Sequence, residues 1–306
     1  IVRKNNIGIY NDSSIITHTG ILEVKHNEAG TENIGAHNTG NGFKFIVKKV
    51  GTNTGFVDVE GQNGTIGISA VTGTTGSGVD VGLNMIYLSM MLHSLPEDVQ
   101  LIVIDPTEVE FKAYNDSPFM YADVVTDVEK TVKVFEYLVE EMENRLSLFD
   151  ELKVLDLETY NAKVSPDERK PYLVLIVEEI FDLMVEHGGK VEECMSRLRQ
   201  KARSAGILTH INTHVPRPEV IKENLVANFP SRLVYKVDNS SQSELVLGEG
   251  GAEFLLGKGD SYIKCAEGDN LVRVQSIFLS DDEISSIIDS TAKKFPDEKY
   301  YSRIKF

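Results

Sequence analysis

The sequence predicts an α/β fold, a mostly parallel, twisted sheet with helices on both faces, preceded by a small β-rich N-terminal region. From about residue 61 onward, short apolar segments of strand length alternate with longer segments of helical periodicity. The apolar segments are continuous, which is typical of parallel strands buried on both faces. Residues 1 to 60 are instead rich in Asn, Gly and Thr. We therefore expect a β-rich accessory region over 1–60 and one main domain over 61–306.

Each element has its own local signal. In the helix before Pro96, apolar residues from Val81 to Leu92 recur at helical spacing, and Asp127 is of the type that caps a helix start. Turn-forming residues separate the short pieces of the accessory region. The expected strands are Phe43–Val47, Gly55–Val59, 65–71, Val99–Ile104, Tyr172–Val177, Ile207–Thr213 and Leu233–Val237. The expected helices run from Val81 to Leu92, from Asp127 towards Phe149, through Val191 to Ala205, and from Asp281 onward.

The glycine-rich turn after the first core strand has the frame of a phosphate-binding loop, G-x-x-x-x-G-K-[ST]. In such a loop, backbone amides cradle phosphates, the lysine meets the β and γ oxygens, and the hydroxyl binds Mg²⁺. Val79 and Asp80 stand where the lysine and the hydroxyl residue belong. The loop alone is consistent with either a vestigial phosphate site or a plain turn. Its residues are Gly73, Thr74, Thr75, Gly76, Ser77, Gly78, Val79 and Asp80.

Composition limits the classes of partner and compartment. The chain has 306 residues and a net charge of −16, so any contact with nucleic acid requires a local basic patch. Cys194 and Cys265 are too few for a disulfide framework and fit a reducing cytoplasm. No apolar run is long enough to span a membrane. The sequence begins at Ile1 and not at methionine, so it does not exclude a preceding segment, such as a membrane anchor.

Several segments, in order and spacing, resemble the motor domain of the FtsK/SpoIIIE family of bacterial DNA translocases. The resemblance covers about two thirds of the chain, from Gly73 to Asp289. It implies a RecA-like P-loop ATPase that forms a hexameric ring around duplex DNA, here without the family's C-terminal winged helix. The matching segments are GTTGSG at 73–78, LPEDVQLIVIDP at 95–106, VVTD at 124–127, EEMENR at 140–145, YN at 160–161, DLM at 182–184, RLRQKARSAGI at 197–207, GGAEFLLGKGD at 250–260 and FLSDDE at 278–283.

The departures from the family pattern fall on the residues that carry its chemistry. Thr107 follows Asp105-Pro106 where the family has lysine, and the Asp-Glu pair that binds Mg²⁺ and orients water becomes Glu178-Glu179. The Thr-Gln-Arg-Pro motif becomes Thr213, His214, Val215 and Pro216, and an Asp-Ser-Arg stretch becomes Gln242, Ser243 and Glu244. With Val79, Asp80, Val215 and Glu244 together, we expect no useful hydrolysis.

Each of these residues also has a structural interpretation. Glu178 and Glu179 are either positional remnants or polar residues at the exposed end of a strand, and His214 is either a sensor or an ordinary hydrogen-bonded histidine. Gly76 and Gly78 have a structural interpretation if the backbone there adopts φ and ψ angles that other residues rarely adopt. A basic run on one helix either contacts DNA or a neighbouring subunit, or is a solvated face balanced by Glu192 and Glu193. The run consists of Arg197, Arg199, Lys201 and Arg203.

The sequence therefore predicts an ATPase-inactive, FtsK/SpoIIIE-like protein with a structural or scaffolding role. It would assemble with itself, as a hexamer by resemblance, or with a paralogue, through inherited ring-type interfaces. Two alternatives stay open. One is an ATP-dependent DNA translocase with an unorthodox site that uses ATP and Mg²⁺, and the other is a ring that binds DNA or nucleotide without hydrolysis.

The remaining expectations concern cofactors and location. We expect no cofactor, no metal and no catalytic residue, and we interpret Glu178, Glu179, Thr213 and His214 as vestigial. DNA remains open as a partner, and no membrane contact is expected for this segment. The expected location is the cytoplasm, which would be a host cytoplasm or a virion if the gene belongs to a virus or mobile element.

Overall fold

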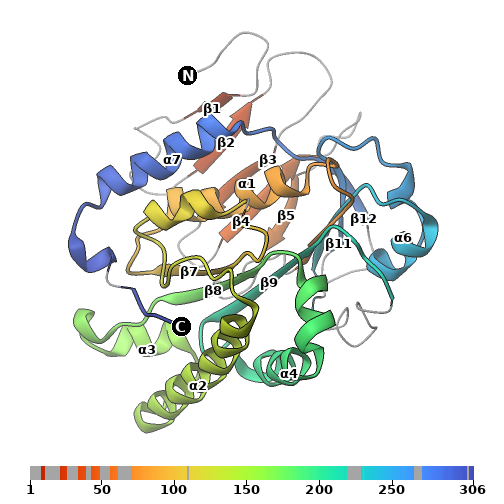
Figure 1. Ribbon diagram of the computed structural model, residues 1–306. Helices are drawn as coiled ribbons and strands as arrows, with labels where there is room; N and C mark the ends of the chain where they lie inside the picture. Colours follow the sequence, from red (N-terminus) through yellow and green to blue (C-terminus); the bar gives the residue numbers. More distant parts are fainter. Residues whose placement is uncertain are drawn as a thin grey trace. The chain divides into compact units, whose positions relative to one another are not determined.

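The computed structural model describes the core of the chain in detail (Figure 1). The described residues are 70–108, 110–218, 229, 231–264, 271–301 and 303–306, with only the backbone of His93, together with the backbone of five N-terminal strands. Contacts divide the chain into two compact units, residues 1–93 with 213–284 and residues 94–212 with 285–306.

The N-terminal strands form an antiparallel sheet in the order β1-β2-β3-β4-β5. Two of them confirm the short strands predicted from the sequence, since β4 and β5 begin at Phe43 and Phe56. A domain boundary near residue 60 stays a prediction. The five strands are β1 (Gly8–Tyr10), β2 (Ile21–Lys25), β3 (Ile34–Asn38), β4 (Phe43–Lys48) and β5 (Phe56–Glu60).

Four more strands of the first unit pair in the order β12-β11-β10-β6. β10 runs parallel to β6, whereas β11 and β12 add antiparallel strands that the sequence analysis did not predict. Residues 65–69 of the predicted strand 65–71 lie outside the described part. Its last two residues belong to β6. The elements are β6 (Ala70–Thr72), α1 (Val79–His93), β10 (Arg232–Tyr235), α6 (Ser240–Leu247), η3 (Ala252–Phe254), β11 (Asp260–Lys264), β12 (Leu271–Gln275) and α7 (Asp281–Lys294), whose last residues belong to the second unit.

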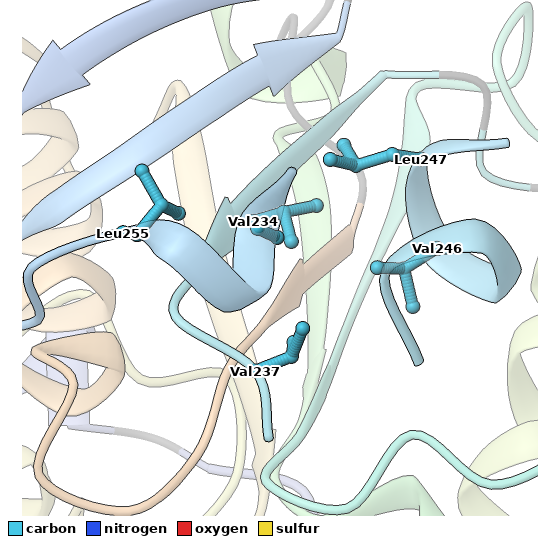
Figure 2. Packing of buried hydrophobic residues seen from close by; sticks show 6 residues of the cluster. Val234, Val237, Val246, Leu247 and Leu255 are labelled. Carbon is cyan, nitrogen blue, oxygen red and sulfur yellow. The ribbon is translucent and has the colours of Figure 1, made fainter. Parts of the chain in front are cut away.

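Helix α1 is apolar on nearly all sides, as expected of a helix enclosed by its unit. Its Gly82 allows close approach to β10, because a Cβ there would lie 1.8 Å from the Tyr235 hydroxyl oxygen. Met90 and Met91 of this helix are buried. A second apolar cluster joins β10 to α6 and the turn after η3 (Figure 2). Its members are Val234, Val237, Val246, Leu247, Ala252 and Leu255.

The second unit holds three parallel strands in the order β9-β8-β7, which confirms the parallel strands predicted from buried apolar segments. Asp127 caps α2 as predicted, since its side chain accepts from the Lys130 amide. Helix α4 begins at Ile180, earlier than predicted, because Glu179 provides its N-cap, and it bends at His187. The elements are β7 (Val99–Ile104), η1 (Lys112–Asp116), α2 (Val128–Leu152), α3 (Leu157–Lys163), η2 (Pro166–Glu168), β8 (Tyr172–Val177), α4 (Ile180–Lys201), β9 (Ile207–Thr213) and η4 (Glu298–Tyr301).

Helices α2 and α4 lie side by side, as Figure 1 shows in yellow-green and green. Arg145, a residue of α2, is buried. The partners of its guanidinium described here all belong to the second unit. Its Nε bonds Glu141 Oε1 at 2.8 Å, and its Nη1 bonds the carbonyls of Pro171 and Ala205 at 2.8 and 3.0 Å. The Arg145 junction therefore ties α2 to the segments that lead into β8 and β9.

Candidate functional site

The loop from Gly73 to Asp80 joins β6 to α1 in the first unit and closes tightly on itself. The Ser77 amide donates to the Thr74 carbonyl at 2.9 Å. Two further bonds attach the loop to strand ends, from the Gly73 amide to the Thr213 carbonyl and from the Thr74 amide to the Lys236 carbonyl. The strand, glycine loop and helix required by a phosphate-binding loop are all present.

The loop glycines are fixed by backbone geometry. Gly76 and Gly78 have φ of 77° and 107°, which confirms the prediction that they adopt angles closed to other residues. At Gly78 a Cβ would also lie 2.6 Å from the Gly259 nitrogen. Gly73 has a different reason, since a Cβ there would meet the Tyr235 Cβ at 2.5 Å. The glycine frame is therefore a requirement of folding and packing.

Val79 fills the space beside the first loop glycine. Its side chain is only 1% exposed. One of its methyl groups, Cγ2, would lie 3.0 Å from a Cβ placed on Gly73. An apolar side chain thus packs into the loop where the loop sequence of phosphate-binding proteins places a lysine, and it has no charge to offer a phosphate.

Asp80 faces His214, a pairing that the sequence analysis did not predict. The two residues come from the start of α1 and from the segment after β9, and Asp80 Oδ1 lies 3.1 Å from His214 Nε2. The Asp80 oxygen is buried, and among the described residues it has no aligned hydrogen-bond donor. The segment that carries His214 is held by Thr213, whose carbonyl accepts from the Thr72 hydroxyl at 2.7 Å and whose Oγ1 accepts from the Val215 amide.

The turn that precedes β11 is bonded to the loop. The Gly259 amide donates to the Ser77 carbonyl at 2.8 Å, and Lys258, next to it, is exposed with a φ of 53°. The Lys258 carbonyl accepts from Gln275 Nε2. Sequence reasoning assigned no role to Lys258, although its position between two glycines was a signal for a strained turn.

Glu178 and Glu179, described in the second unit, do not lie at an exposed strand end. Glu178 is 1% exposed and accepts a hydrogen bond from Asn212 Nδ2 at 2.6 Å. Glu179 adopts φ of 47°, and its carboxylate accepts from the Phe181 amide, which caps α4. The interpretation that these two glutamates are polar residues at the exposed end of a strand was therefore wrong. Whether they are catalytic or vestigial stays a prediction.

Asp105 organises the turn in which Thr107 replaces the expected lysine. Its fully buried carboxylate accepts bonds from the Thr107 hydroxyl at 2.6 Å and from the amides of Thr107, Glu108 and Phe111. Asp-Pro after a strand is a turn signal, and side-chain bonds to following amides are the usual mechanism. This carboxylate is thus fully engaged in its own turn.

The basic run on α4 is partly neutralised by α2. Arg197 forms an ion pair with Glu143, and Lys190 contacts Glu136 and Glu193. Arg199, Lys201 and Arg203 are exposed. Within the run, Arg197 is thus balanced from α2, whereas Glu193 pairs with Lys190, which is not part of the run. Contact of the run with DNA or a neighbouring subunit stays a prediction.

The structure tests the predictions about the cysteines and about membrane-spanning segments only in part. Cys194 is buried and unpaired by disulfide, and burial raises the pKa of its thiol. Cys265 lies outside the described residues. Within the described part, no helix combines the length and the apolar character needed to cross a bilayer.

Comparison with protein families and curated proteins gives a consistent result. The model of the FtsK/SpoIIIE family matches residues 57–220. The DNA translocase FtsK of Haemophilus influenzae is 37% identical over an alignment of 244 positions, which covers 72% of this chain and 46% of that protein. The protein of the same name from Streptococcus pneumoniae is 40% identical over an alignment of 226 positions, which covers 71% of this chain and 30% of that protein. The chain thus spans less than half the length of these relatives.

Solved structures resemble the chain in fold. The conjugation coupling protein TcpA of pCW3, in a monomer form with ATPγS, superposes with a TM-score of 0.69 at 22% identity, over 94% of this chain and 75% of that one. EssC ATPases 2 and 3 from Geobacillus thermodenitrificans give a TM-score of 0.71 at 19% identity, over 89% and 51%. These likenesses, with the seven mostly parallel strands, confirm the predicted RecA-like P-loop fold.

Proposed function

Because the chain belongs to the FtsK/SpoIIIE family, we propose that it is a member whose nucleotide site does not hydrolyse ATP and which serves as a structural subunit. The supporting observation is the filling of its phosphate loop. Val79 is buried against Gly73, and Asp80 places a carboxylate beside His214 at the start of α1. The loop keeps its backbone shape without the side chains that grip phosphate.

Electrostatics supports this proposal. The N-terminus of a helix attracts anions, because its unpaired amides and its dipole present partial positive charge. Asp80 already supplies an anion there, so a polyphosphate would have to approach a fixed carboxylate. Each lost charge-assisted contact to phosphate removes about 1.5–3 kcal/mol of interaction. Loss of the lysine and gain of a carboxylate thus act in the same direction.

The acidic pair after β8 supports it in a weaker way. A water-orienting glutamate must be able to turn a carboxylate oxygen towards the nucleophile or its metal. One oxygen of Glu178 accepts from Asn212, and the Glu179 carboxylate accepts from the Phe181 amide of its own helix. These bonds orient both carboxylates towards structural partners, although each bond uses only one of the two carboxylate oxygens.

The alternative is an ATP-dependent DNA translocase, the activity in the names of the curated relatives. One observation favours it. Lys258 belongs to the turn that bonds the phosphate loop through Gly259, and its four-carbon stem could bring an ammonium towards the loop. In that case Lys258 would supply the charge that Val79 lacks.

Nucleotide turnover and binding separate the two functions. We expect purified protein to release no phosphate from Mg-ATP above background, with or without duplex DNA, and Glu179→Gln to change nothing. Mg-ATP should not raise the melting temperature of the natural chain, because a ligand that prefers the native state must stabilise it. The double variant Val79→Lys/Asp80→Ser restores the loop motif and should gain a shift.

Turnover that Glu179→Gln abolishes would contradict the proposal, and its loss in Lys258→Gln would identify the alternative. The structural half of the proposal has its own test, which is the oligomeric state. Electron microscopy and sedimentation should show a ring or another regular assembly. A monomer at all accessible concentrations would contradict assembly through ring-type interfaces.

A further inference from the structure

We propose that Asp80 and His214 together bind a divalent transition-metal ion of the zinc, cobalt or nickel class. Both residues belong to the first unit, and this site goes beyond the proposed function. It does not require nucleotide. An imidazole nitrogen and a carboxylate oxygen, the two donor types in this pair, are common ligands of zinc.

The distance between the two donor atoms fits shared coordination. Zinc lies about 2.0–2.2 Å from imidazole nitrogen and from carboxylate oxygen. Two such bonds at a right angle place the ligand atoms about 3.0 Å apart, and a tetrahedral angle places them about 3.4 Å apart. The 3.1 Å between Asp80 Oδ1 and His214 Nε2 lies between these values. The separation of the two atoms therefore allows one ion to contact both.

No described residue donates an aligned hydrogen bond to the buried oxygen of Asp80. Asp80 Oδ1 is buried and has no such donor among them, although His214 is close. A buried acceptor without a partner is costly, and a bound cation would remove this cost. The observed contact is thus a poor hydrogen bond but a suitable pair of ligand positions.

The donor set selects the class of metal. Imidazole suits zinc, copper, iron and nickel, whereas magnesium prefers an octahedron of oxygen ligands. A histidine beside the carboxylate therefore disfavours the ion used in nucleotide hydrolysis. The side chains of His214 and Asp80 are 17% and 28% exposed, so an ion can enter and water can complete its coordination.

The backbone around both ligands is held in place, which limits the entropy lost on binding. The Asp80 carbonyl accepts from Asn84 Nδ2 at 3.0 Å inside α1. On the other side, the Thr213 carbonyl accepts from the Thr72 hydroxyl, directly before His214. Asp80 also lies in the first turn of α1, where a carboxylate is favourable.

The experiment is a metal titration of the natural chain without nucleotide. Metal-free protein is titrated by calorimetry with ZnCl₂, CoCl₂ and MgCl₂, and the visible absorption of cobalt reports its ligand geometry. We expect one equivalent of zinc and of cobalt at this site and much weaker binding of magnesium. Asp80→Ser and His214→Gln should each weaken zinc binding at least tenfold, and both should remove the cobalt absorption.

A second histidine–carboxylate pair among the described residues provides a matched control. His187 Nε2 lies 3.5 Å from Glu129 Oε1 in the second unit, and Glu129 is largely exposed. His187→Gln should leave the affinity for zinc unchanged. Circular dichroism of the metal-free variants shows whether each one is folded before it is compared.

The proposal is overturned if the natural chain binds neither zinc nor cobalt, or if folded Asp80→Ser and His214→Gln proteins both bind zinc as tightly as the natural chain. An equal loss in His187→Gln would also overturn it. None of these results depends on ATP turnover. Failure of the metal site would leave the inactive nucleotide site in place, and measured turnover would leave the metal result in place.

Discussion

The phosphate loop and the Arg145 junction differ in how completely their buried polar atoms are hydrogen-bonded. At the Arg145 junction, the guanidinium donates to one carboxylate and two backbone carbonyls. In the loop, Ser77 Oγ and Asp80 Oδ1 are buried, and among the described residues neither has an aligned hydrogen-bond partner. The first region is built as a structural network, and the second keeps polar atoms that the fold itself does not use.

This difference separates stability from function. Buried polar groups that stabilise a fold are normally satisfied, and unsatisfied ones call for another explanation, such as an absent ligand or a former catalytic role. We therefore expect substitutions at the Arg145 junction to affect folding strongly. Substitutions of the unsatisfied loop atoms should affect folding little.

The largest expected effect is that of Arg145→Met. Removal of one partner from a buried ionic network typically costs about 3–5 kcal/mol, because the remaining groups stay buried without a donor. Urea unfolding of the variant should show a loss of this size. The matched control is Arg197→Met, since Arg197 is 49% exposed and pairs with Glu143 across α2 and α4. An exposed ion pair contributes about 1 kcal/mol or less. Equal losses in the two variants would contradict the structural importance of the Arg145 junction.

The next effect depends on pH and concerns His210 in β9. Burial lowers the pKa of this histidine from 6.5 to about 3, so it stays neutral in the folded chain. The unfolded chain binds a proton below pH 6.5 and the folded chain does not, so stability falls as the pH drops towards 3. At pH 5 this group alone should remove about 2 kcal/mol.

Paired unfolding curves of the natural chain and of His210→Asn, from pH 8 to pH 5, measure this contribution. The variant has its own stability, but the difference between the two proteins should shrink or reverse as the pH is lowered. A constant difference over this range would show that His210 is not held neutral by the fold.

Much of the fold could be predicted from local patterns. The strands Val99–Ile104 and Tyr172–Val177 agree with the structure to the residue, because each is a mainly apolar run that ends at an acidic residue, Asp105 or Glu178. The capping role of Asp127 followed from residue type alone. Helix α6 and strands β11 and β12 were not predicted. The segments 260–264 and 271–275 mix polar and apolar residues, since only part of each strand is buried.

The candidate site was predictable only in part. The glycine spacing identified the loop, and the absence of lysine was visible in the sequence. The contact between Asp80 and His214 joins residues far apart in the chain, and it arises because β6 and α1 lead to the same place as the end of β9. No periodicity contains that information. The burial of Glu178 was equally invisible, because its partner Asn212 lies in a later strand, β9.

The smallest expected effect returns to the loop and tests the comparison directly. Ser77→Ala removes a buried hydroxyl with no hydrogen-bond partner in the described part of the chain, so the free energy of unfolding should stay the same or rise by about 1 kcal/mol. Ser243→Ala is the matched control, because the Ser243 hydroxyl is also buried but donates to the Glu249 carbonyl and accepts from the Ala252 amide. The control should lose about 1–2 kcal/mol, since two backbone groups lose their partner. Thermal and urea unfolding of both variants provide the comparison. A loss in Ser77→Ala as large as that in Ser243→Ala would mean that the loop hydroxyl stabilises the fold, and that the loop and the Arg145 junction do not differ in kind.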